Sequence, residues 1–220
     1  IVGFKTWLKE AEITENNALT PLGEKLQLLG SDSPITWGVI YTNLCYESPI
    51  INWYAKKIEV GRTYFADDLP ILLGEEYSAT VKKNALSSLK ETLRLSPIGW
   101  LLLQGECEVR GKTVATITKG SWYDAEPIVI LYSLYKFAEK MDGLYSFTLS
   151  DLLEDSDDRD AVSPRTIFGL DRETLKPILQ GLANNYSGFI QVDFNKGIME
   201  NIDLPAGKNS KKAVDVLSLI

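Results

Sequence analysis

Two stretches of the chain show the same succession of patterns: a short helix, a turn, a longer helix and then a β-hairpin. In the first stretch the spacing predicts a short helix over 65–74 and a longer one, capped by Ser78, that ends near Leu93. Strand-like arms follow over 101–109 and 113–119, with alternation of apolar and polar residues. This order is typical of a winged-helix module.

The second stretch repeats the order with different residues. A short helix is expected over 147–153, a longer helix after the cap Asp171, and a hairpin over 189–204 around Asn195-Lys196-Gly197. Pro177 lies inside that longer helix, so we expect it to kink the helix or to lie near its first turns. The copies lie about eighty residues apart, longer than the roughly 20–50 residues of a solenoid unit, so we infer a repeated module.

The beginning of the chain resembles the end of such a module. Apolar residues at helical spacing precede a short extended piece over 13–19, and Thr20-Pro21 then caps a new helix. Helices are also expected from Pro34, from Pro49, and over 127–141. The first residue is Ile1, not methionine, in what reads as the middle of a helix, so we expect an upstream part to be missing.

These patterns predict a mainly α fold with small β-hairpins, built from about three winged-helix-like modules joined by helices. The first module is partial and is expected over residues 1–62, with linking helices. The second, with its following helix, is expected over 63–142. The third, with a short C-terminal amphipathic helix over 211–220, is expected over 143–220.

Several classes of enzyme lack the residues they need. The chain contains no histidine, which removes Ser-His-Asp and Cys-His nucleophile activation and every zinc site that uses imidazole. Cys45 and Cys107 form no CxxC spacing, and we expect two reduced thiols. No phosphate-binding glycine loop and no GxSxG elbow occurs. We therefore expect a protein that is not an enzyme by itself and that uses no cofactor and no metal.

The acidic run over 154–160 could suggest a metal site. It lacks the turn glycine and the distal glutamate of a calcium loop, so a solvated loop is the expected structure. The sequence also contains no membrane-length apolar run and no charged-then-apolar leader. We expect a cytoplasmic protein of bacterial type with no membrane partner.

Charge points to one candidate surface. The net charge of −7 disfavours a tight sequence-blind DNA binder, because the phosphate backbone favours basic surfaces. The helix after Ser78 is nevertheless locally basic, and the hairpin tip that follows carries two more cations. The predicted nucleic-acid-binding residues are Lys82, Lys83, Asn84, Lys90, Arg94, Arg110 and Lys112. An ordinary solvated face is the competing interpretation. The third module, with Arg165 and Arg172 in acidic surroundings, is expected to form a protein contact instead.

A set of landmarks resembles a known family. These are Gly3-Phe4-Lys5-Thr6-Trp7-Leu8-Lys9, Leu19-Thr20-Pro21-Leu22-Gly23, Thr36-Trp37, Ile51-Asn52-Trp53-Tyr54 and Ile167-Phe168-Gly169-Leu170-Asp171. They are similar to a bacterial domain-of-unknown-function family whose members are often labelled phosphoadenosine phosphosulfate reductase or sulfotransferase. The resemblance implies a context of DNA sulfur modification and phage defence. The enzymatic label does not transfer, because the pyrophosphate loop and the reactive C-terminal cysteine of those reductases are absent here.

Three functions remain open at this point. The first is a non-catalytic recognition or accessory protein that binds nucleic acid, with DNA as the expected partner, or binds a sulfur-transfer or DNA-modification enzyme. The second is a protein related to phosphoadenosine phosphosulfate reductases or sulfotransferases, or an accessory region of one. The third is a dimerisation scaffold in which the helix after Ser78 is covered.

Overall fold

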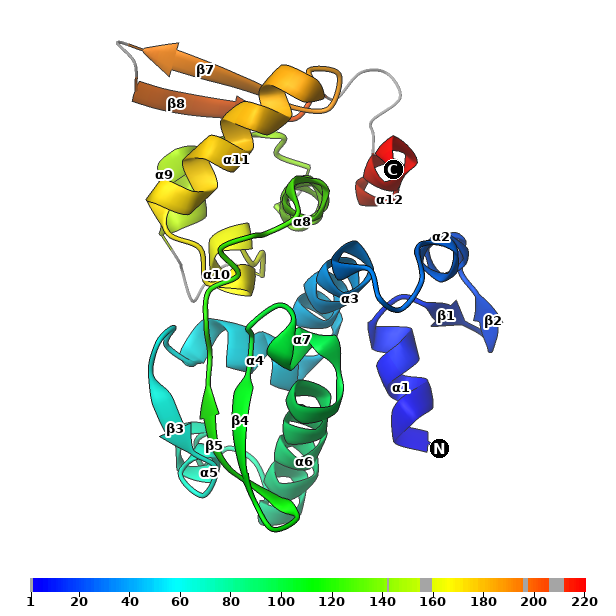
Figure 1. The fold of residues 1–220 in the computed structure, drawn as a ribbon, viewed down its shortest axis with the longest axis vertical. Coiled ribbons are helices and arrows are strands. Elements are labelled where there is room, and N and C mark those ends of the chain that lie inside the picture. Colours follow the sequence, from blue (N-terminus) through cyan, green and yellow to red (C-terminus); the bar gives the residue numbers. More distant parts are fainter. Residues whose placement is uncertain (1, 142, 155–159, 196–197, 206–211) are drawn as a thin grey trace.

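The computed structural model describes residues 2–141, 143–154, 160–195, 198–205 and 212–220. Within these ranges the protein is mainly helical and has small antiparallel sheets, as the sequence predicts (Figure 1). No described helix combines the length and the apolar character needed to cross a bilayer.

The elements follow one another as helices interrupted by short strands. The helices are α1 (Val2–Glu10), α2 (Pro21–Leu29), α3 (Pro34–Glu47), α4 (Pro49–Lys57), α5 (Leu69–Leu72), α6 (Ala79–Leu95), α7 (Pro97–Trp100), α8 (Pro127–Lys140), α9 (Leu149–Leu153), α10 (Pro164–Phe168), α11 (Arg172–Asn185) and α12 (Ala213–Val216). A 3₁₀ turn over Leu217–Leu219 follows α12. The strands are β1 (Thr14–Glu15), β2 (Ala18–Leu19), β3 (Thr63–Phe65), β4 (Glu106–Arg110), β5 (Thr113–Thr118), β6 (Ser146–Thr148), β7 (Gln191–Asn195) and β8 (Ile198–Asp203).

Local capping explains where many helices begin. Helices α2, α3 and α4 each start with proline directly after a threonine or serine, as the sequence predicts. At α2 the Thr20 hydroxyl accepts a hydrogen bond from the Gly23 amide at 2.9 Å. The proline fixes the first helical turn without losing a needed donor, because the first amides of a helix have no partner within it.

Helices α3 and α8 form the centre of the molecule (Figure 1). Residues 128–138 of α8 are all buried, so this helix is apolar around its whole circumference. Its polar groups are paired: the Tyr132 hydroxyl donates to the Asn43 side chain at 2.8 Å, and the Asn43 amide donates to the Ala11 carbonyl at 3.1 Å. This buried chain of hydrogen bonds connects α8 to α3 and to the end of α1.

Two three-stranded sheets have the same topology and register. Each unit contains a strand, a short helix, a long helix and a hairpin, and the strand orders are β3-β5-β4 and β6-β8-β7. An additional short helix follows the long helix in the first unit (α7) and precedes it in the second (α10). In the first strands, Tyr64 pairs with Ile117 and Phe147 pairs with Ile202, and all four side chains are buried. Both hairpins shift register after the third residue of their first strand. The match in pairing and in the bulge establishes a structural repeat.

The sequence interpretation missed the first strand of each unit. A helix was expected from Phe65, but that residue ends β3 and is 61% exposed, and the helix α5 starts only at Leu69. Tyr64 is therefore the structural equivalent of Phe147, which itself lies in β6 and not in a helix. Strands of three residues are too short to show a measurable alternation, and this explains the error.

Other expectations need smaller corrections. The stretch 101–105 is not a strand, because α7 and an irregular turn precede β4. Helix α11 continues through Pro177, which lies exposed six residues after the cap. The expected C-terminal helix is reduced to α12 and its 3₁₀ turn. The hairpin tip at 196–197, residue 211, and the part of the acidic run at 155–159 lie outside the described residues.

Candidate nucleic-acid interface

Helix α6 is held to the rest of the protein along one apolar stripe. Ser78 caps it by accepting a hydrogen bond from the Val81 amide at 3.4 Å. Leu86, Leu89 and Leu93 recur at spacings of three and four residues and are buried, whereas most of the remaining surface is exposed. A long helix with one buried side presents its other sides to solvent, where polar residues are free to bind a partner.

The structure separates the predicted cations of α6 into two groups. Lys83, Lys90 and Arg94 lie seven and four residues apart, so they share one side of the helix. Lys82 is rotated by about 100° from Lys83, which places it on the side of the buried leucines. Lys82 and Lys90 are both half-buried, whereas Lys83 and Arg94 are exposed. Asn84 lies on the opposite side and lines a groove. Of the helix residues predicted to bind nucleic acid, three form a continuous cationic side, which we call the α6 cationic stripe.

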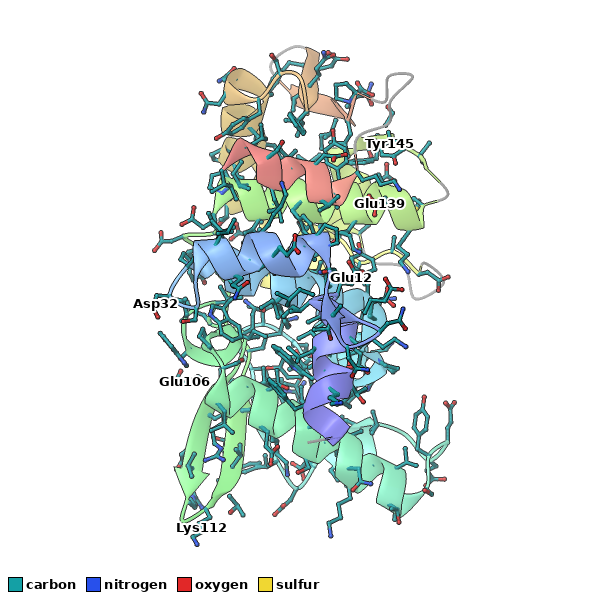
Figure 2. The ribbon with its side chains drawn as sticks, turned by 90° about the vertical axis from the view of Figure 1, so that its right-hand side faces the viewer. Glu12, Asp32, Glu106, Lys112, Glu139 and Tyr145 are labelled. Atoms are coloured by element: carbon teal, nitrogen blue, oxygen red, sulfur yellow. The ribbon has the colours of Figure 1, made fainter. Side chains whose placement is uncertain are left out.

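The hairpin tip carries the remaining two predicted cations. Gly111 has φ +66°, a conformation that L side chains rarely adopt, and it closes the turn between Arg110 and Lys112. The Arg110 side chain pairs with the Glu108 carboxylate at 3.4 Å, and both are exposed. Lys112 lies at the far end of the hairpin (Figure 2). Arg110 is therefore partly neutralised, and Lys112 is the freer charge at the tip.

The cationic stripe borders the hairpin. Helix α6 packs against β4. Burial raises the pKa of the Cys107 thiol in that strand, and the charge of Arg94 opposes this increase. Within the part of the chain that the structure describes, Lys83, Lys90, Arg94 and Lys112 have no carboxylate within 4.0 Å. Glu106 and Glu108 are exposed along the same strand and weaken the positive field beside it.

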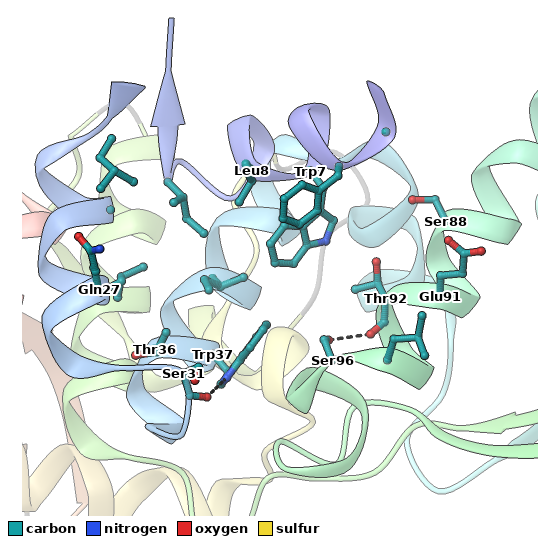
Figure 3. A pocket seen from close by; sticks show the side chains of 18 of the residues that line it. Trp7, Leu8, Gln27, Ser31, Thr36, Trp37, Ser88, Glu91, Thr92 and Ser96 are labelled. Carbon is teal, nitrogen blue, oxygen red and sulfur yellow. Dashed lines mark hydrogen bonds between the residues drawn. The ribbon is translucent and has the colours of Figure 1, made fainter. Parts of the chain in front are cut away.

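A groove separates the other side of α6 from α1, α2 and α3 (Figure 3). Its volume is about 1050 Å³, and Trp7 and Trp37 line its apolar wall. The Trp37 indole donates to the Ser31 carbonyl at 2.7 Å, which fixes that ring. Helix α6 contributes Ser88, Glu91 and Thr92 to the opposite wall, so this side carries no cation. Both tryptophans are half-buried and pack against the hydrophobic core while they line this groove.

Sequence reasoning also missed a buried lysine. Lys119 directly follows β5 and is 1% exposed. Its ammonium group donates to the Ala55 carbonyl at 2.7 Å and to the Thr166 carbonyl at 3.0 Å. It lies 5.9 Å from the centre of the Tyr54 ring. Nothing in the sequence distinguishes Lys119 from a surface lysine at a strand end, because its carbonyl partners come from segments more than forty residues away.

The two cysteines are free and poorly suited to chemistry. Burial raises the pKa of Cys45 to about 12. Cys107 is half-buried, and its pKa is also raised. The thiolate is the reactive form, and little of it is present at neutral pH at either position. Among the described residues, no group of three Asp, Glu or Cys side chains is arranged to hold a metal ion.

No known family matches the sequence, and no curated protein or solved structure is significantly similar to it. The resemblance to the family labelled phosphoadenosine phosphosulfate reductase therefore stays a prediction from the sequence.

Proposed function

We propose that the protein is a non-catalytic recognition module that binds nucleic acid through the unit formed by β3, α5, α6, β4 and β5. In this proposal both repeated units are winged-helix modules, α6 is the recognition helix and the β4–β5 hairpin is the wing. The observation that carries the proposal is the α6 cationic stripe: Lys83 and Arg94 are exposed, Lys90 between them is half-buried, and none of the three has a carboxylate partner among the described residues.

The chemistry of phosphate contact fits this stripe. Lysine and arginine side chains that neutralise backbone phosphates release condensed counterions, which makes binding strongly salt-dependent. In a winged-helix module, the helix and hairpin cations would contact phosphates on either side of a groove. The net charge of −7 opposes binding at long range, so we expect modest affinity that is lost at high salt.

The exposure of α6 argues against cover of this helix by the other unit of the same chain. Val81 is 51% exposed, and the cationic residues Lys83 and Arg94 are exposed as well. If this helix were the buried contact between the modules of one chain, these side chains would be covered by the neighbouring unit. They are not covered within the described ranges.

The direct test is fluorescence anisotropy with duplex DNA, single-stranded DNA and RNA across a salt series. The wild-type protein is compared with the triple variant Lys83→Gln/Lys90→Gln/Arg94→Gln. If all three cations contact phosphates of a duplex, the slope of log affinity against log salt falls by about 2.7, at roughly 0.9 per contact. We expect the variant to lose roughly 30-fold or more in affinity at low salt.

A second triple variant, Arg62→Gln/Lys176→Gln/Lys212→Gln, removes the same charge elsewhere on the surface and serves as the control. We expect it to retain nearly all of the binding. No binding by folded wild-type protein at low salt would overturn the proposal. Equal losses in the two triple variants would also overturn it, because they would show a response to net charge and not to the stripe.

A further inference from the structure

The groove between α6 and the helices α1, α2 and α3 has an aromatic wall that a ligand can reach. The rings of Phe4, Trp7 and Trp37 follow one another along this wall, with centroids 6.4 and 6.5 Å apart. Phe4 is 64% exposed, and the two tryptophans are half-buried. The groove volume of about 1050 Å³ lies at the upper end of the range of small-molecule sites. A flat aromatic group can therefore stack inside it.

The aromatic wall also holds an unused hydrogen-bond donor. The Trp37 indole is occupied by the Ser31 carbonyl, but the Trp7 indole N–H makes no hydrogen bond to a described residue. Figure 3 shows the Trp7 nitrogen on the edge of the ring that faces Thr92 of α6. The Phe4 ring lies nearly parallel to Trp7, with 7° between their planes, and supports its orientation.

The opposite wall, formed by α6, is polar. Asn84, Ser87, Ser88 and Glu91 recur at spacings of three, one and three residues, so they share one side of the helix. All four are exposed, and their side chains form no hydrogen bond or ion pair with another described residue. Glu91 is the one charged side chain among the described residues that line the groove. The two walls together suit a ligand that stacks and also carries donors and acceptors on its edge.

This polar side lies next to the α6 cationic stripe. Asn84 and Glu91 are each one residue beyond Lys83 and Lys90, which rotates them by about 100° around the helix axis. A nucleic-acid strand with its phosphates on the stripe can therefore turn its bases toward the groove. Bases in a duplex must first be unpaired and unstacked, which costs free energy, whereas those of a single strand are available. The Glu91 carboxylate repels phosphates and so favours bases on the groove side.

We propose that the groove takes up bases of a single-stranded nucleic acid whose phosphates lie along the α6 cationic stripe. This inference rests on the proposed function and specifies its substrate class. The bases stack on Phe4 and Trp7, as in single-strand-binding proteins that combine cations with aromatic rings. Glu91 accepts a hydrogen bond from the amino group of cytosine, whereas thymine has a carbonyl oxygen at that position. The site therefore prefers cytosine to thymine.

The test is fluorescence anisotropy at low salt with labelled strands of about 12 nucleotides, within the site sizes of roughly 4–16 nucleotides known for single-strand-binding domains. The strands are oligo-dC, oligo-dT, a duplex, and an abasic strand that keeps the phosphates and lacks the bases. We expect oligo-dC to bind several-fold more tightly than oligo-dT. Both should bind more tightly than the duplex and the abasic strand.

Two substitutions examine the two walls. Phe4→Ala removes an exposed ring, so the fold stays intact, and it should weaken oligo-dC binding by about 5-fold to 150-fold, the range for one lost base–aromatic contact. Glu91→Gln should bring oligo-dC and oligo-dT to nearly equal affinity, because an amide can serve either base. Glu173→Gln removes the same charge from an exposed site on α11 and should keep the cytosine preference. Circular dichroism checks that each variant is folded.

The results separate this inference from the proposed function. Equal binding of the single strands, the duplex and the abasic strand would show that the bases do not enter the groove, while the cationic stripe still binds phosphates. No effect of Phe4→Ala, or a cytosine preference that survives Glu91→Gln, would overturn the inference in the same way. Absence of binding to every strand by folded wild-type protein would overturn both proposals.

Discussion

Helices α6 and α11 occupy the same position in two sheets of identical strand order, yet their solvent-facing residues differ. Counted from the caps Ser78 and Asp171, buried leucines stand at the eighth and eleventh residues of both helices. These pairs are Leu86 with Leu179 and Leu89 with Leu182. Two buried leucine positions are therefore shared, whereas the buried Leu175 corresponds to Lys82 and most outward positions differ.

Taken together, the outward differences leave α11 less positive than α6, although Ala79 corresponds to Arg172 and Glu91 to Asn184. Lys90 corresponds to Ala183, and Arg94 falls in the last turn of the 17-residue helix α6, beyond the end of the 14-residue helix α11. Only Lys83 has a cationic counterpart, Lys176. Helix α11 keeps only Arg172 and Lys176, which lie at its first turns and form no stripe along the helix, so the comparison predicts that the first unit binds nucleic acid much more strongly than the second.

Substitutions in the buried core test whether the two units are equivalent. We expect Leu89→Ala and Leu182→Ala each to lower the free energy of unfolding by about 2–5 kcal/mol, since both side chains are fully buried and each truncation leaves a cavity. Urea unfolding followed by circular dichroism measures this loss. The matched surface substitution Lys90→Ala should change it by less than about 0.5 kcal/mol. A large loss in one unit and none in the other would show that the two cores are not equivalent.

The repeat and the long helices could be predicted from the sequence, because helix caps and the spacing of apolar residues are local features. Ser78 and Asp171 were identified as caps, and the helix expected over 127–141 is α8. The first strand of each sheet was missed because β3 and β6 are three residues long and are stabilised by pairing with β5 and β8, more than fifty residues away. Such pairing overrides any local preference.

The candidate sites were predictable only in part. The charged residues of α6 could be identified from the sequence. Which of them share one side of the helix, and that Lys82 and Asn84 lie on other sides than Lys83, depends on which side of α6 packs against the protein. The groove beside α6 could not be predicted at all. Trp37 and Glu91 belong to segments more than fifty residues apart, and they line one groove only in the folded chain.

The helix caps give a second, smaller test of equivalence. Asp171→Ala and Ser78→Ala should each cost about 1 kcal/mol of stability at neutral pH, because each removes the acceptor for the third amide of its helix. The two caps differ in charge. Hydrogen bonds from Thr174 hold the pKa of Asp171 below its usual value, so its stabilisation is complete at neutral pH and is lost as the pH falls through that lowered pKa.

Unfolding measured from pH 7 to pH 3 separates the two caps. The difference between wild type and Asp171→Ala should shrink with acidity, whereas the difference between wild type and Ser78→Ala should stay constant. Asp171→Asn is the matched control, since asparagine caps helices without titrating. A pH-independent cost for Asp171→Ala would contradict the assigned cause of the lowered pKa.

The smallest effect concerns the first strands of the two hairpins, where Glu108 and Asp193 occupy the same place, one residue before the bulge. Glu108 lies 3.4 Å from Arg110, so Glu108→Gln should free that guanidinium for a phosphate and strengthen nucleic-acid binding by roughly twofold, or about 0.5 kcal/mol. Asp193→Asn makes the same charge change beside α11 and should leave anisotropy titrations unchanged. Equal gains from both substitutions would mean that only net charge matters, and the distinction between the two units would then fail.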